Sequence, residues 1–227
     1  MKSGIPLLAS FLPRMQPQDL FFLNEWVRKA GATVVYVTYE FAPQAPFPTG
    51  LEQVIAVYRA LREGTHADRI GFQAIPLVVA GLSAGGNLAV AAVISPFVRA
   101  SIGACASNET SRIDSNSTSR IESEDDELRG DANGRSEAHR RSPSPTSPSA
   151  LQMPDAMLLL CPVLNLNRSP SPSRIAFAAD TILPAPLLQA FGSAYDGGDG
   201  GPEKWSDPLL SPAFASDDVL RRLPPTR

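Results

Sequence analysis

With 227 residues, 43% of them hydrophobic, the chain is long enough to fold as one domain with a sizeable core. Its formal net charge of −3 belongs to residues 101–150, which hold 9 acidic and 6 basic side chains, so the remainder is neutral. A neutral body argues against nucleic acid as a partner, and no apolar run reaches the length expected of a membrane span.

Neither the N-terminus nor the cysteines indicate a secreted or metal-binding protein. The apolar run Ile5–Ala9 is short and contains a proline, so it is a poor secretory signal, and cytoplasmic residence is expected. Cys105 and Cys161 lack the spacing of metal ligands. Cys161 ends an apolar run typical of a strand and is expected to be a small buried residue.

Helix and strand patterns alternate along the chain. In chain order they predict a helix at 19–30, a strand at 33–39, a helix at 49–63, a strand at 75–80, a helix from 84 to about 98, a strand at 155–161 and a helix at 183–195. Strands that alternate with helices predict an α/β fold whose sheet is mostly parallel, with helices on both faces.

A low-complexity segment divides the chain into residues 1–100, 101–150 and 151–227. The middle segment contains twelve serines and an acidic cluster, and it has almost no apolar area to bury, so disorder is expected. Its Arg140-Arg141-Ser142-Pro143 run fits a kinase site, and a neutral insertion is the alternative interpretation.

The chemistry of the chain is concentrated in a G-x-S-x-G motif between a predicted strand and a predicted helix. Such a nucleophile elbow would hold the Ser83 hydroxyl above the strand end, and the Ala84 N–H would supply one donor of an oxyanion hole. A glycine-rich connection with an incidental serine is the other interpretation. The full motif reads Gly81-Leu82-Ser83-Ala84-Gly85-Gly86-Asn87.

Several further motifs resemble, in the same order, those of the hormone-sensitive lipase family of α/β-hydrolases, and the eukaryotic members in particular. They are Tyr39–Pro48, the elbow, Ser171–Arg174, Asp207–Pro212 and Leu223–Thr226. The resemblance covers residues 10–100 and 151–227. It implies an α/β-hydrolase fold, truncated at both ends, and a serine carboxylic-ester hydrolase that works through an acyl-enzyme. The implied substrate is a lipid or small carboxylic ester, with peripheral contact to lipid droplets or membranes and no cofactor.

The same resemblance implies an incomplete catalytic domain. The family's His-Gly-Gly-Gly loop should fall near Leu7-Leu8-Ala9-Ser10, which contains neither residue type, and its catalytic Asp and His follow the segment that matches Leu223–Thr226. His66 precedes the serine and His139 lies in the low-complexity segment, so neither is expected to be the base. Leu82 stands where the family usually has Asp.

We therefore expect the 227-residue polypeptide to be inactive. Two alternatives stay open. One is a non-catalytic relative that binds a small ligand, as the gibberellin receptors of plants do. The other is a truncated gene product without function.

Overall fold

The computed structural model describes residues 5–8, 17–64, 76–116, 153–167, 171–176 and 180–226. Four strands in this part of the chain form one parallel sheet in the order β2-β1-β3-β4. The strands are β1 (Ile5–Leu8), β2 (Val35–Tyr36), β3 (Leu77–Leu82) and β4 (Ala156–Leu160). The carboxyl ends of parallel strands meet at one edge of the sheet, where ligands bind in such folds.

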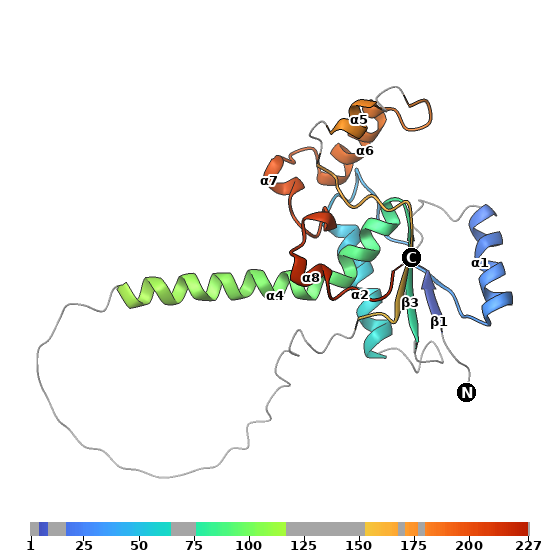
Figure 1. Cartoon of the computed structure of the whole chain (residues 1–227), viewed down its shortest axis with the longest axis horizontal. Coiled ribbons are helices and arrows are strands. Elements are labelled where there is room, and N and C mark those ends of the chain that lie inside the picture. The colour runs from blue at the N-terminus through green and yellow to red at the C-terminus, as the bar shows by residue number, and fades with distance from the viewer. Residues whose placement is uncertain are drawn as a thin grey trace, which may run out of the picture.

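Helices alternate with these strands, as the sequence predicts. They are α1 (Pro17–Ala30), α2 (Thr49–Glu63), α4 (Ala84–Asn116), α5 (Pro172–Ala176), α6 (Ala185–Asp196), α7 (Pro202–Trp205), the 3-10 turn η2 (Pro212–Phe214) and α8 (Asp217–Leu220). Figure 1 shows α1 on the opposite side of the sheet from α2 and α4. The predicted α/β fold, a parallel sheet with helices on both faces, is confirmed.

The core lies between β3 and the pair α2 and α4. Leu51 of α2, Leu77 of β3 and Ile94 of α4 are completely buried. Full burial of one such side chain stabilises the fold by about 1.5–3 kcal/mol relative to exposure. Residues 85–94 of α4 are all buried, and apart from Asn87 they are small or apolar, as expected of a helix surrounded by the rest of the core. Both ends of the Ser83 turn are therefore fixed by packing.

Two strands differ from the sequence prediction. Only Val35 and Tyr36 of the run at 33–39 pair as strand. The sequence analysis makes no prediction for their neighbour β1, and a proline such as Pro6 is unusual in a central strand. In the structure β1 lies between β2 and β3, and Pro6 is opposite Val78.

Helix α4 is longer than expected and enters the segment that was predicted to be disordered. It was predicted to end near Val98 but continues to Asn116, so the prediction of disorder from residue 101 is wrong for residues 101–116. Extending an existing helix costs little, since each added residue gains a backbone hydrogen bond, and this stretch contains no proline. The rest of the predicted insertion, 117–150, lies outside the described residues.

The expectation that no apolar run could span a membrane needs correction. Within the described residues, the 19-residue stretch Ala84–Ile102 of α4 is long enough and apolar enough to cross a membrane, by length and composition alone. In the structure 72% of this stretch is buried inside the protein, and buried core helices can have the same length and apolar composition.

Candidate active site

Ser83 lies at the turn between the last residue of β3 and the first residue of α4, where the sequence predicts a nucleophile elbow. Its φ of +53° is a conformation that a non-glycine residue rarely adopts. The Ser83 N–H donates to the Leu160 carbonyl of β4 at 2.9 Å, which extends the sheet pairing by one residue. Ser83 is an exposed residue and is not buried in the core.

Two glycines let the chain double back at this turn. A Cβ atom on Gly81 would lie 2.4 Å from the Gly85 carbonyl oxygen. A Cβ atom on Gly86 would lie 2.6 Å from Cβ of Pro162, in the loop that follows β4. Both distances are far below van der Waals contact, so only glycine fits at either position. The structure thus requires glycine at Gly81 and Gly86 of the motif.

The loop after β4 packs directly on the turn. The Ser83 carbonyl accepts hydrogen bonds from the N–H groups of Val163 at 3.2 Å and Gly86 at 3.0 Å. Asn87, which is 3% exposed, donates from Nδ2 to the Val163 carbonyl at 2.8 Å and to the Leu210 carbonyl at 2.9 Å. One buried amide thus joins α4 to two distant segments. The sequence reasoning gave Asn87 no role, although a polar residue within an apolar helix was a signal.

The motif at Asp207–Pro212 has a structural role in this arrangement. Ser211 is completely buried, and its Oγ accepts a hydrogen bond from the Leu166 N–H at 3.0 Å. The Ala213 N–H donates to the Leu164 carbonyl at 3.0 Å. These contacts hold the far part of the loop that begins at Cys161, so the loop is fixed at both ends.

Cys161 was expected to be buried, and that prediction is wrong. The residue is exposed and has a φ of +39°. β4 ends at Leu160, and the chain must turn sharply there to bring Val163 back to Ser83. The turn points the cysteine outward instead of continuing the strand into the core.

Three further residues of the motif, Leu82, Ala84 and Gly85, lie next to Ser83 at the turn. Ala84 is exposed and is the first residue of α4, where helical N–H groups have no acceptor within the helix. That position suits the predicted oxyanion donor, and the role itself stays a prediction. Gly85 is buried, and Leu82 is 40% exposed.

The structure does not bring an acid or base to Ser83 within the described residues. Leu7 and Leu8, at the expected place of the family's glycine loop, belong to strand β1, while Ala9 and Ser10 lie outside the described residues. Both histidines of the sequence, His66 and His139, also lie outside them.

Comparisons with known proteins agree with this fold. A family model described as the alpha/beta hydrolase fold matches residues 15–104. Hormone-sensitive lipase of Mus musculus is 26% identical over 176 residues, which are 78% of this chain and 16% of the lipase. Carboxyl esterase 2 from the fungus Tuber melanosporum superposes with a TM-score of 0.66 at 18% identity, covering 99% of this chain and 57% of the esterase. A hyperthermophilic esterase from Pyrobaculum calidifontis gives a TM-score of 0.64 at 22% identity, with coverages of 99% and 56%.

The chain therefore has the α/β-hydrolase fold. Among curated proteins it is similar to hormone-sensitive lipases, at 25–26% identity over 78% of its length. The similar proteins named above are esterases and a lipase. The chain spans less than two thirds of the length of the relatives given above.

Proposed function

We propose that this chain is the serine-bearing part of a carboxylic-ester hydrolase of the hormone-sensitive lipase type. The observation that carries the proposal is Ser83 at φ +53° between the end of β3 and the start of α4. A nucleophile elbow imposes this conformation, and a simple strand-to-helix connection has no need of it. The relatives named hormone-sensitive lipase suggest a lipid ester as the substrate.

In the proposed reaction the Ser83 hydroxyl attacks the ester carbonyl carbon. A base removes the hydroxyl proton, and the Ala84 N–H stabilises the oxyanion that forms. The alcohol leaves with a proton, and water then releases the fatty acid from the acyl-enzyme. Lack of a base costs several orders of magnitude in rate, so the 227-residue polypeptide is expected to turn over negligibly.

The test measures hydrolysis of p-nitrophenyl butyrate by two polypeptides: the 227-residue chain and the longest reading frame that the transcript encodes. Each is compared with its Ser83→Ala variant. The proposal is supported if a longer frame that adds an Asp and then a His hydrolyses the ester and Ser83→Ala abolishes the turnover. It fails if such a frame is folded and inactive, or if turnover survives Ser83→Ala.

A non-catalytic binding protein is the second candidate, and the observation in its favour is the position of Leu7 and Leu8 within β1. No glycine stands there to form the family's second oxyanion donor. Tight binding of a small ester or acid with no turnover, unaffected by Ser83→Ala, would favour this alternative.

A further inference from the structure

We propose that Val163 is a specificity-determining residue for the ester that Ser83 attacks, and that its side chain limits the width of the acyl group. This inference rests on the proposed function and adds to it a named determinant of substrate choice. Val163 lies in the loop that follows β4, and its side chain is 36% exposed. Single exposed apolar side chains are common on protein surfaces, so the position of Val163 relative to Ser83 decides its significance.

The chain from Leu160 to Val163 wraps around the backbone of Ser83. The Ser83 N–H donates to the Leu160 carbonyl at 2.9 Å, and the Ser83 carbonyl accepts from the Val163 N–H at 3.2 Å. Both backbone groups of the serine are therefore bonded to this one short segment. In the proposed reaction the acyl group becomes bonded to Ser83 Oγ, so the exposed side chains of the segment border the acid part of the ester on the β4 side.

The backbone of Val163 is fixed, so its side chain cannot move aside for a wider substrate. Its carbonyl accepts from Asn87 Nδ2 at 2.8 Å, in addition to the bond that its N–H makes to Ser83. Pro162 lies so close to Gly86 that a Cβ atom there would be 2.6 Å from Cβ of Pro162, and the loop has no room to retreat. A β-branched side chain is also stiff at χ1. A fixed, stiff wall discriminates between acyl groups by their width.

The surroundings of this wall are uncharged. The sequence contains no charged residue from Leu77 to Val98 or from Ala156 to Asn167. Arg174, which contacts the loop, donates to the carbonyls of Asn165 and Asn167. A carboxylate carried on the acyl group would lose hydration here, and burying a charge without a partner is costly. Esters of uncharged carboxylic acids are therefore the suitable probes, and we expect unbranched acids to be preferred.

A thiol at position 83 allows the test to be made on the 227-residue chain. At about pH 8.5 roughly half of an ordinary thiol is ionised, so Ser83→Cys can be acylated by an activated ester without a general base. Cys161→Ser is included in every variant, because Cys161 is an exposed thiol next to the site. The single-turnover release of p-nitrophenolate from p-nitrophenyl butyrate and from the branched p-nitrophenyl pivalate gives two rates. Mass spectrometry of the peptide that contains position 83 confirms the acylated residue.

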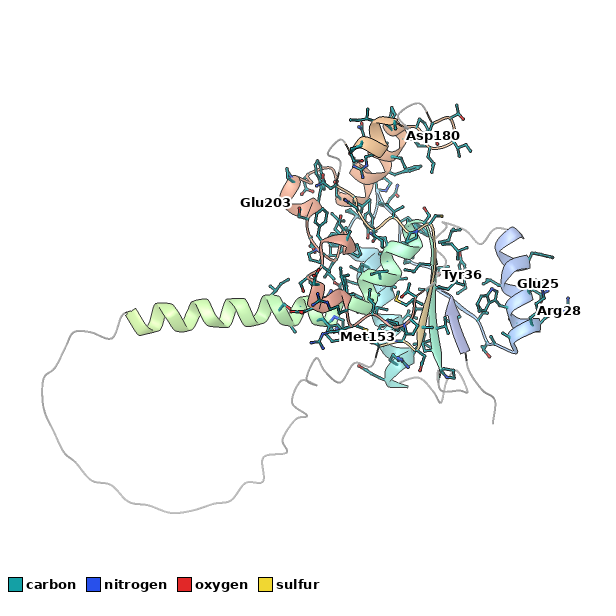
Figure 2. All side chains as sticks on the ribbon, viewed as in Figure 1. Glu25, Arg28, Tyr36, Met153, Asp180 and Glu203 are labelled. Atoms are coloured by element: carbon teal, nitrogen blue, oxygen red, sulfur yellow. The ribbon has the colours of Figure 1, made fainter. Side chains whose placement is uncertain are left out.

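The quantity compared is the ratio of the pivalate rate to the butyrate rate. Val163→Ala should raise this ratio about tenfold, and Val163→Phe should lower it by a similar factor, as expected for a few carbon atoms in an apolar contact. A general disturbance of the fold would slow both esters and leave the ratio unchanged. Val27→Ala is the matched control, since Val27 is 43% exposed on α1. In Figure 2, Glu25 and Arg28 of the same helix lie across the sheet from α4.

The inference is overturned if neither Val163 variant moves the ratio further than Val27→Ala does, or if both variants move it in the same direction. It is also overturned if the thiol at position 83 shows the same ratio as free glutathione before Val163 is changed. Circular dichroism melting confirms that each variant is folded. The thiol reaction needs no base, so a folded but inactive longer frame would end the proposed function without altering this ratio. An unshifted ratio beside an active longer frame would end only the inference about Val163.

Discussion

The side-chain amide of Asn87 and the backbone carbonyl of Val163 lie 2.8 Å apart and join the helix that follows Ser83 to the loop that follows the neighbouring strand. In the same loop, the Val163 N–H donates a hydrogen bond to the Ser83 carbonyl at 3.2 Å. The conformation of Ser83 therefore depends on the buried side-chain amide of Asn87, as well as on Gly81 and Gly86.

Replacing Asn87 by Ala should destabilise the fold by about 2–4 kcal/mol, because it leaves the buried Leu210 carbonyl and the partly buried Val163 carbonyl without their donor. Denaturant unfolding followed by circular dichroism measures the loss. Asn165→Ala serves as the control: Asn165 is exposed and its side chain bonds only the nearby Asn167 N–H among the described contacts, so we expect less than about 1 kcal/mol. Equal losses in the two variants would contradict the role assigned to Asn87.

The second prediction concerns the stability cost of replacing the glycines of the turn. Gly81→Ala should cost about 3 kcal/mol or more, because the new methyl group would overlap backbone atoms that cannot move without distorting the turn. Gly86→Ala should cost about 1–3 kcal/mol, since it meets Pro162.

Gly201→Ala provides the control for this series. Nothing lies within 4 Å of its Cβ position and its φ is −90°, so the change should stay within about 0.5 kcal/mol. Thermal midpoints of the three variants give the comparison. A Gly81→Ala variant as stable as the Gly201→Ala variant would show that the turn does not form as described.

The sequence predicted the Ser83 turn correctly because the signal is local: an apolar strand, two glycines and an apolar helix stand next to one another. The role of Asn87 could not be predicted, since its two acceptors lie 76 and 123 residues away along the chain. The exposure of Cys161 was missed for a related reason. A buried strand favours a buried final residue, and only the need for Val163 to reach Ser83 turns the chain outward.

Leu82 gives a third prediction, which concerns the position where the family usually has Asp. The side chain is 40% exposed at the end of β3, so Leu82→Asp should change the unfolding free energy by no more than about 0.5 kcal/mol. Val79→Asp is the contrasting variant, three residues earlier on the same strand. Val79 is 3% exposed in the core, and a carboxylate there should prevent stable folding. Denaturation midpoints of the soluble variants check this difference.

The last prediction concerns alkaline pH and Tyr58, which packs in the core on α2 and is 3% exposed. Burial raises the pKa of Tyr58 from 10.0 to about 12. Below pH 10 the phenol is neutral in both the folded and the unfolded chain, and its full contribution to stability is present. Between pH 10 and 12 the unfolded chain loses the proton more readily, so the free energy of unfolding falls by about 1.4 kcal/mol per pH unit.

Tyr58→Phe should remove this contribution and flatten the decline, while Tyr39 and Tyr195, whose pKa values are also raised by burial, continue to titrate on unfolding. Denaturant unfolding at several pH values from 9 to 12, with absorbance at 295 nm to follow phenolate formation, measures both effects. An identical pH dependence in wild type and Tyr58→Phe would show that Tyr58 ionises as freely in the folded chain as in the unfolded one.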